Sequence, residues 1–222
     1  MVFITGASGF MGRRLSAELI RRGHTVRGLV RRGSESRLAP GCEGVTGDAL
    51  DAVSYRDMVK GCSALVHLVG VSHPSPAKAA QFRSIDLASA REAIAAGVYA
   101  GIRHFVYVSV AHPAPVMKEY IAARIEVEEM LRASGLNSTI LRPWYVLGPG
   151  RRWPLLLLPA YWLLGAFPRT RESAARLGLV TVKQMIDTMA MAVEHPPSGV
   201  RVLEAPRIRE AGAGGLEPGA GW

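Results

Sequence analysis

Short apolar runs alternate along the chain with segments of helical periodicity. The apolar runs, each of which predicts a buried β-strand, lie at residues 2–5, 25–30, 44–47, 64–69, 104–109, 138–142 and 200–204. The predicted helices between and after them lie at residues 10–22, 52–60, 78–99, 116–134 and 181–194. Strands joined by helices of this length form a parallel sheet that is covered on both faces. The pattern therefore predicts one doubly wound α/β domain over residues 1–210.

Two segments interrupt this alternation. Residues 155–167 are strongly apolar, but they are too short to span a bilayer, and prolines stand at their edges and middle. We expect them to belong to a small C-terminal substrate lobe at about residues 144–180. The apolar segment 153–168 has three interpretations: a lid over an apolar substrate, a homodimer surface, or a peripheral membrane contact. The glycine-rich residues 211–222 predict a flexible tail.

Composition and charge narrow the classes of partner. The chain carries a net charge of +9, from 27 Lys and Arg against 18 Asp and Glu. The arginines form scattered doublets without interleaved aromatic residues, which disfavours nucleic acid but suits small phosphorylated ligands. Cys42 and Cys62 provide neither a disulfide framework nor a four-ligand zinc site, and no group of side chains has metal-ligand spacing. With no signal peptide ahead of the first strand, we expect a cytoplasmic protein.

A glycine-rich turn follows the first predicted strand. Thr5-Gly6-Ala7-Ser8-Gly9-Phe10-Met11-Gly12 ends that strand and opens an amphipathic helix. Free N–H groups and the helix dipole at such a terminus attract a pyrophosphate. Gly6 permits the tight turn, Gly9 leaves room for the phosphates, and Gly12 lets the helix pack closely on the sheet. We therefore expect a dinucleotide to contact Gly6, Ser8, Gly9, Phe10, Met11 and Gly12.

This turn resembles the T-G-x-x-G-x-x-G signature of the extended and atypical short-chain dehydrogenase/reductases. The similarity continues in order through Gly47-Asp48-Ala49-Leu50, His67-Leu68-Val69-Gly70, Tyr107-Val108-Ser109-Val110 and Leu141-Arg142-Pro143. It covers nearly all of residues 1–205 and is greatest for the epimerase/dehydratase-like, NmrA-like and complex I accessory-subunit-like branches. The resemblance implies a Rossmann fold whose cofactor site includes Asp48, Ala49, Leu68, Val69, Gly70 and Pro143.

The end of the second predicted strand bears on which dinucleotide is bound. An NAD enzyme usually offers a carboxylate there to the ribose 2′-hydroxyl, whereas this chain offers Arg31 and Arg32. Two guanidinium groups would bind a 2′-phosphate through charge-assisted hydrogen bonds. The sequence therefore favours NADP over NAD. A solvated arginine pair is the other interpretation.

The resemblance also implies catalytic residues. Tyr120 would transfer a proton while hydride passes to or from the nicotinamide, and Ser109 would bind the substrate oxygen. The chain departs from the family at Arg124, where the family has lysine. Arginine keeps a cation on the same helix face as Tyr120, but its guanidinium is larger and differently directed. His67 is expected to be structural, whereas His73 and His112, in proline-bearing loops, are candidate substrate contacts.

Three hypotheses follow. The first is an NADP-dependent oxidoreductase or redox isomerase acting on a small, apolar carbonyl or alcohol, with Tyr120, Arg124 and Ser109 as its catalytic residues. The second is a noncatalytic NADP-binding protein that senses redox state or supports the assembly of a complex. The third is a flavin- or quinone-directed reductase in which hydride passes without a proton from tyrosine. The sequence contains no G-x-S-x-G motif, which disfavours hydrolysis.

Overall fold

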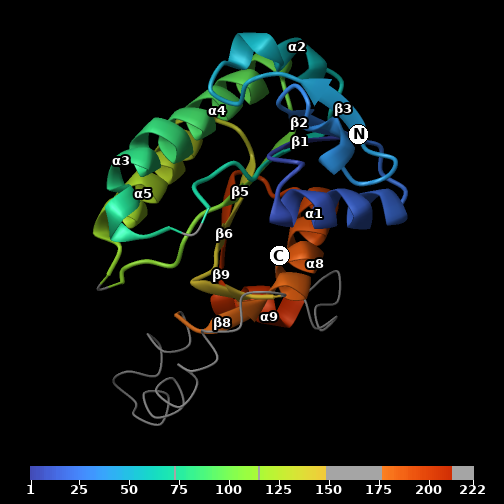
Figure 1. Ribbon diagram of the computed structural model, residues 1–222. Coiled ribbons are helices and arrows are strands. Elements are labelled where there is room, and N and C mark those ends of the chain that lie inside the picture. The colour runs from blue at the N-terminus through green and yellow to red at the C-terminus, as the bar shows by residue number, and fades with distance from the viewer. Residues whose placement is uncertain (73, 115, 149–176, 212–222) are drawn as a thin grey trace.

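A seven-stranded parallel sheet forms the centre of the protein in the computed structural model, which describes residues 1–72, 74–114, 116–148 and 177–211 (Figure 1). The strands follow the spatial order β3-β2-β1-β4-β5-β6-β9. Their bounds are Val2–Thr5 (β1), Val26–Val30 (β2), Glu43–Thr46 (β3), Ala64–His67 (β4), His104–Val108 (β5), Ser138–Arg142 (β6) and Val200–Glu204 (β9). The direction of winding changes between β1 and β4, and ligands bind at such a switch point in open α/β sheets. The predicted doubly wound Rossmann fold is confirmed.

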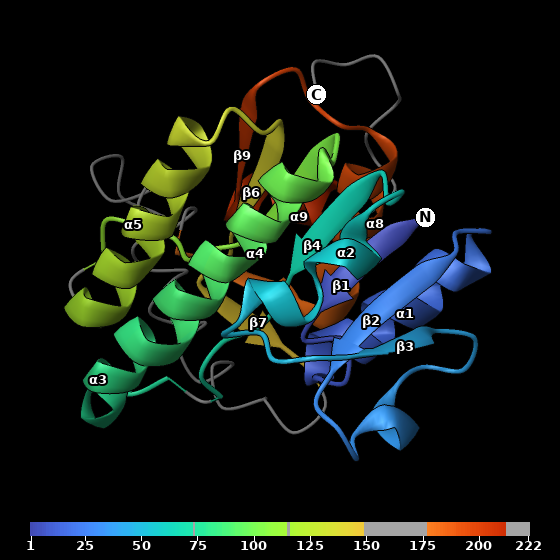
Figure 2. The ribbon, with the colours of Figure 1, turned by 90° about the horizontal axis from the view of Figure 1, so that it is seen from above.

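Helices cover both faces of the sheet. One layer contains α1 (Phe10–Arg21), α8 (Val182–Glu194) and α9 (Ala205–Ala211). The opposite layer contains α2 (Arg56–Val59), α4 (Ala88–Ala100) and α5 (Lys118–Ala133). Figures 1 and 2 show the strands between these two layers. Single 3₁₀ turns at Glu35–Arg37 and Ala52–Ser54 complete the connections on either side of β3.

Alternate residues of each strand face opposite helical layers. In β1, Val2 and Ile4 pack in the cluster beneath α1 and α8, whereas Phe3 packs in the cluster beneath α2 and α4. Phe3 also stacks on Tyr55, with ring centroids 5.8 Å apart. Because both faces of a parallel sheet are buried, its strands are apolar at every position rather than at every second one. This explains the continuous apolar runs in the sequence.

The predicted helix at 78–99 is interrupted. A 3₁₀ turn at Pro76–Lys78 leads into α3 (Ala79–Gln81), then into a π-helical turn at Phe82–Leu87, and then into α4. A π turn holds an extra residue, and such turns are frequent at functional sites. This one buries both Phe82 and Asp86 against α5 and the loop after β4.

Three short elements were not predicted. Strands β7 (Tyr145–Leu147) and β8 (Leu179–Thr181) pair with each other, and α9 follows β9 directly. Three-residue strands are too short to show a period, which is why the sequence pattern missed them. The prediction that the tail begins at Ala211 is wrong, because Ala211 ends α9 and is buried.

Most of the remaining C-terminal predictions fall outside the described residues. They are the apolar segment 153–168, the centre of the proposed lobe at 144–180, and residues 212–222. Among the helices that the structure describes, none is long and apolar enough to cross a membrane.

Gly12 lets α1 pack tightly against the turn that follows β1. A Cβ atom there would collide with the carbonyl oxygen of Gly6 and would lie 2.7 Å from the Cα of Ala7. Because both neighbours are backbone atoms, we expect Gly12→Ala to lower the free energy of unfolding by about 3 kcal/mol, near the upper end of overpacking effects. Denaturant titration measures this loss. Gly9→Ala is the matched control, since its Cβ would lie 3.1 Å from the same oxygen. An unchanged midpoint for Gly12→Ala would contradict the packing described.

An ion-pair chain joins α1 to α8 and gives a second prediction. Glu18 accepts hydrogen bonds from Arg21 and Arg22, and Arg22 also binds Glu194 of α8 at 2.8 Å. The hydrogen bond from Arg21, aided by Arg22 and opposed by burial, lowers the pKa of Glu18 from 4.5 to about 2. A carboxylate with a depressed pKa stabilises the fold above its unfolded pKa and loses that contribution as the pH falls.

We therefore expect Glu18→Gln to lower the thermal midpoint at neutral pH, and the difference from wild type to shrink between pH 4.5 and about 2. Glu210→Gln is the control, since Glu210 belongs to an exposed pair with Arg207. A difference that does not depend on pH would show that the charge of Glu18 contributes nothing.

Candidate functional site

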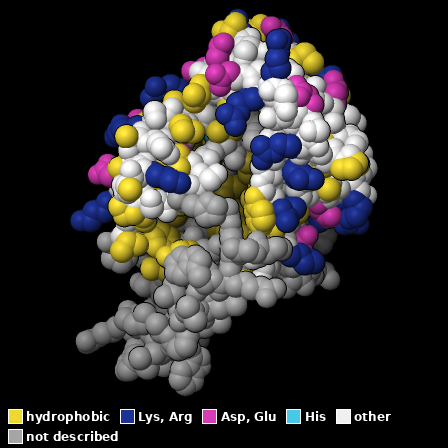
Figure 3. All heavy atoms as spheres, in the orientation of Figure 1, with side chains coloured by type: hydrophobic (Ala, Val, Ile, Leu, Met, Phe, Trp, Pro, Cys, Tyr) yellow, Lys and Arg dark blue, Asp and Glu magenta, His cyan; other side chains and the backbone are white. Residues whose placement is uncertain are grey.

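A cleft of about 540 Å³ lies at the carboxyl ends of β1, β2 and β4. Nine of the residues predicted to hold a cofactor line it: Gly6, Ser8, Gly9, Arg31, Asp48, Ala49, Leu68, Val69 and Gly70. Figure 3 shows this face hollowed between the two helical layers, with Lys and Arg side chains gathered on one side of the hollow. The cleft therefore coincides with the switch point of the sheet, where a dinucleotide binds in folds of this kind.

Because its glycines carry no side chains, the glycine turn exposes backbone atoms to the cleft. Gly6 has a positive φ of 74°, and a Cβ atom there would lie 2.8 Å from the carbonyl carbon of Leu68. Gly9 is the N-cap of α1 and forms no side-chain capping bond. The first N–H groups of α1 are therefore not capped by a side chain, which is the arrangement that accepts a phosphate. The residues of the turn fit a dinucleotide pyrophosphate.

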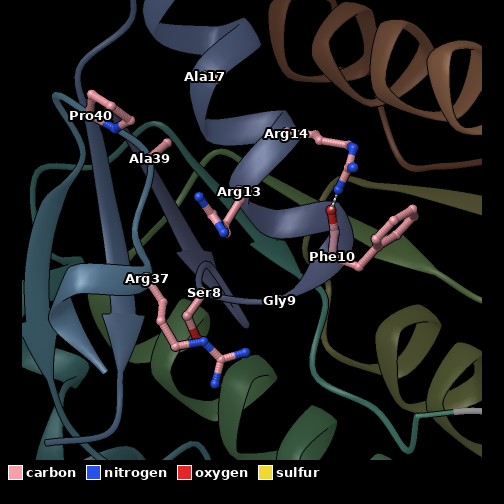
Figure 4. Close-up of a pocket in the computed structure, with 9 residues that line it drawn as sticks. All are labelled: Ser8, Gly9, Phe10, Arg13, Arg14, Ala17, Arg37, Ala39 and Pro40. Atoms are coloured by element: carbon pink, nitrogen blue, oxygen red, sulfur yellow. Dashed lines mark hydrogen bonds between the residues drawn. The ribbon is translucent and has the colours of Figure 1, made fainter. Parts of the chain in front are cut away.

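Arginines gather on the β2 side of the turn. Arg31 lines the cleft, and so does Arg37 from the 3₁₀ turn after β2, whereas Arg32 is not among the lining residues. Arg37 also reaches a neighbouring pocket of about 560 Å³, which Arg13 of α1 lines as well. Figure 4 shows the side chain of Arg37 running past Ser8 and that of Arg13 lying nearer Ala39. Within the described part of the chain, no ion pair engages Arg13, Arg31 or Arg37, which leaves their charges available to an anion.

The neighbouring Arg14 serves a different purpose. It donates to the carbonyl oxygen of Phe10 at 2.8 Å and stacks over the Phe10 ring at 4.0 Å (Figure 4).

Sequence reasoning missed Arg37, because nothing in the local pattern indicates which exposed arginine folds back over the glycine turn.

Four predicted cofactor residues besides Arg32 do not line the cleft. Phe10 lines the neighbouring pocket, and Gly12 packs α1 on the sheet. Met11 packs at the edge of the core cluster beneath α1. The carbonyl oxygen of Pro143 accepts a hydrogen bond from the amide of Ala111 at 2.9 Å, which joins the segments that follow β5 and β6. Direct cofactor contact by these residues stays a prediction.

The predicted catalytic pair lies on the inner face of α5. The guanidinium carbon of Arg124 lies 5.0 Å from the centre of the Tyr120 ring, and Phe82 packs against the same ring. Arg124 is 7% exposed and forms an ion pair with Asp86 from the π-helical turn. It also donates to the hydroxyl of Tyr107 at 3.1 Å and to the carbonyl oxygen of Val108 at 2.9 Å. The cation predicted to assist Tyr120 is thus held in a buried network.

Ser109 belongs to a second buried network. Its hydroxyl donates to Glu128 of α5 at 2.7 Å, and Arg142 of β6 donates to both oxygens of the same carboxylate. Burial alone would raise the pKa of Glu128, but the hydrogen bonds from Arg142 and Ser109 lower it below its ordinary value. Arg142 also binds Glu204 of β9 at 2.9 Å. This network ties α5 to β6, to β9 and to the residue that follows β5.

Sequence reasoning missed Glu128, although a signal for it exists. Tyr120, Arg124 and Glu128 follow one another at intervals of four residues and therefore share one face of a helix. Asp86 has no such signal, because it meets Arg124 only across 38 residues of chain.

The histidines divide as follows. His67 in β4 is buried, and desolvation lowers its pKa to about 3, so the ring is neutral at ordinary pH. It is hydrogen-bonded to the hydroxyl of Thr5 at 2.8 Å, in keeping with a structural role. Nε2 of His112 lies 3.4 Å from Oε1 of Glu128, beside the Ser109 network. His73 lies outside the described residues.

Comparison with known proteins agrees with this geometry. A family described as NAD(P)H-binding matches residues 6–151. The ceramide reductase of Caulobacter vibrioides is 32% identical over 152 residues, which are 68% of this chain and 47% of that protein. The 4-hydroxy-2-methyl-3-oxo-4-farnesyl-3,4-dihydroquinoline-1-oxide ketoreductase of Stigmatella aurantiaca is 26% identical over 168 residues, which are 66% of this chain and 50% of that protein. The chain thus spans about half the length of these curated relatives.

A solved structure shows the same fold. The short-chain dehydrogenase/reductase superfamily protein of Agrobacterium tumefaciens with bound NAD has a TM-score of 0.67 and 21% identity, over 92% of this chain and 77% of that one. The family match covers well over half of the chain and includes the glycine turn, the cleft and α5. The chain therefore belongs to the NAD(P)H-binding family and shares the Rossmann fold of that short-chain dehydrogenase/reductase superfamily protein.

Proposed function

We propose that the protein is an NADP-dependent oxidoreductase, or a related redox isomerase, that acts on a small apolar carbonyl or alcohol. The observation that carries the proposal is the cleft itself, in which a bare glycine turn lies beside Arg31 and Arg37. A dinucleotide pyrophosphate suits the first feature and a ribose 2′-phosphate suits the second.

The charge around the end of β2 supports NADP rather than NAD. No carboxylate follows Val30 directly, and Glu35 is not among the residues that line the cleft. Hydrogen bonds from the backbone N–H groups of Glu35 and Gly33 lower the pKa of the Glu35 carboxyl, so that carboxylate is already engaged within its own turn. Neither position therefore offers a ribose 2′-hydroxyl a free carboxylate, whereas Arg31 and Arg37 offer two cations to a 2′-phosphate.

Proton transfer is assigned to Tyr120, and binding of the substrate oxygen to Ser109. When bound, the dinucleotide would supply or accept a hydride at its nicotinamide ring. Tyr120 would give a proton to the substrate oxygen during reduction, or take one from it during oxidation. Because the hydroxyl hydrogen of Ser109 points at Glu128, Ser109 is arranged to accept a hydrogen bond from a substrate hydroxyl. Arg124 would contribute a fixed positive charge beside the Tyr120 ring.

The apolar nature of the substrate is supported by two observations. Residues 153–168 are rich in leucine and aromatic side chains. The relatives include a reductase named for ceramide and a ketoreductase named for a farnesylated substrate. A lid or peripheral membrane contact at 153–168 would suit such molecules.

A noncatalytic NADP-binding role is the second candidate. Arg124 is already bound to Asp86, Tyr107 and Val108, and the Ser109 hydrogen is already bound to Glu128. Two of the three groups assigned to catalysis therefore have protein partners, as they would in a protein that senses or stores the cofactor without turning over a substrate.

Cofactor preference tests the assignment of the arginines. We expect calorimetry to show tighter binding of NADPH than of NADH. We expect Arg31→Ala combined with Arg37→Ala to weaken NADPH binding by roughly 10- to 100-fold, because charge-assisted hydrogen bonds are lost, and to change NADH binding by less than about threefold.

Arg32→Ala is the matched control, because Arg32 adjoins Arg31 in sequence but does not line the cleft. Equal affinities of the wild type for NADPH and NADH would contradict the preference for NADP. A loss confined to Arg32→Ala would move the 2′-phosphate to that side chain.

Tyr120→Phe tests the chemistry. With a small apolar ketone that the wild type reduces, we expect kcat to fall by about 10²–10⁴ because the proton donor is gone. NADPH affinity should stay within about twofold of wild type, since the phenyl ring still packs on Phe82 and Arg124. Unchanged turnover would remove Tyr120 from the mechanism. Intact NADPH binding without turnover of any ketone or alcohol in a broad panel would favour the noncatalytic role.

A further inference from the structure

We propose that Asp86 is a positioning residue for the cofactor. Together with Arg124 it forms a buried ion pair that fixes Gly70 and Val71, and thereby the part of the cleft that receives the half of the dinucleotide beyond the pyrophosphate. The inference rests on the proposed dinucleotide site and adds a residue to it.

The two oxygens of Asp86 have different partners. Oδ1 forms the ion pair with Nη2 of Arg124, and Oδ2 accepts a hydrogen bond from the amide of Val71 at 2.9 Å. The side chain is 1% exposed and lies in the π-helical turn Phe82–Leu87. One carboxylate therefore joins α5 to the loop that follows β4.

Arg124 extends the connection from Asp86 to β5. Its Nη1 donates to the hydroxyl of Tyr107 and to the carbonyl oxygen of Val108, both in β5. With these bonds and the ion pair, the guanidinium has a single orientation between β5 and the π-helical turn. Through Asp86 and Arg124, the loop after β4 is therefore held in a fixed position relative to β5, the strand that leads to Ser109.

Gly70 brings the loop directly against this pair. A Cβ atom at Gly70 would lie 2.8 Å from Nη2 of Arg124 and 3.1 Å from Oδ1 of Asp86. On its other side the same segment, Gly70 to Ser72, lines the cleft. A displacement of the ion pair would therefore change the shape of the cleft wall at Gly70 to Ser72.

The cost of the pair supports a positional role. Burial raises the pKa of Asp86 in spite of the opposing charge of Arg124. Replacing a buried ion pair by apolar residues is often neutral or stabilising, so such a pair is weak evidence for stability. The two contacts of Asp86, one to a cation and one to the amide of a cleft residue, explain the presence of the pair better than a contribution to stability does.

The cleft has two ends that the experiment can address separately. Arg31 lies at the end proposed for the ribose 2′-phosphate, whereas Gly70 to Ser72 follow β4, and Gly70 lies against Arg124 of α5. Adenosine 2′,5′-bisphosphate occupies only the first end, and NADPH occupies both. Asp86 should matter for the second ligand alone.

Calorimetric titration of both ligands into wild type and Asp86→Asn tests this inference. For Asp86→Asn we expect NADPH affinity to fall by about tenfold or more, as for the loss of a bond to a charged group, and affinity for the bisphosphate to stay within about twofold. Asp187→Asn removes a carboxylate from a surface pair with Lys183 and should change neither affinity. Equal losses for both ligands, or no loss for NADPH, would overturn the positioning role.

Two further variants guard against misfolding, since Asp86→Asn leaves the charge of Arg124 uncompensated. Asp86→Asn with Arg124→Gln removes both charges and should show the same selective loss of NADPH affinity. Gly70→Ala approaches the pair from the cleft side and should do likewise. If both fold and bind NADPH as wild type does, the inference is wrong. If wild type binds neither ligand, the proposed cofactor site itself fails, which is a distinct result.

Discussion

The approach of α1 to the end of β1 constrains the rest of this structure. Gly12 lets the first turn of the helix contact the backbone of Gly6 and Ala7, and no side chain is small enough to take its place. With α1 held there, its uncapped amino end points into the crevice where the sheet changes its direction of winding. The same backbone contact thus serves packing and opens the place for a phosphate.

Charge is arranged differently on the two sides of that crevice. Beside β2 the cations Arg31 and Arg37 are exposed and line the cleft, as suits an anion that arrives from solvent. Beside β4 and β5 the cation Arg124 is buried and compensated by Asp86. The first arrangement attracts a ligand, whereas the second holds backbone in place. Both depend on arginine, whose planar guanidinium keeps its charge in either environment.

The inner face of α5 links the two buried networks. Arg124 connects it to β5 and to the loop after β4, and Glu128 connects it to Ser109 and Arg142. Tyr120 lies one turn before Arg124 on that face. The position of the Tyr120 ring is therefore set by its contacts with Arg124 and Phe82, and not by the helix alone.

The sequence by itself determined the class of fold, the glycine turn and the helical spacing of Tyr120 and Arg124. These features are local: strand burial, helix periodicity and the stereochemistry of glycine act within a few residues of chain. The sequence also indicated, by its spacing four residues beyond Arg124, that Glu128 shares that helix face, although we did not predict a role for it. Only the tertiary structure decided that Asp86 pairs with Arg124, that Arg37 rather than Arg32 lines the cleft, and that Arg142 binds Glu128 and Glu204. Crossover connections and loop folding bring those side chains together from distant parts of the chain, and contacts of that kind produce no periodic pattern in the sequence.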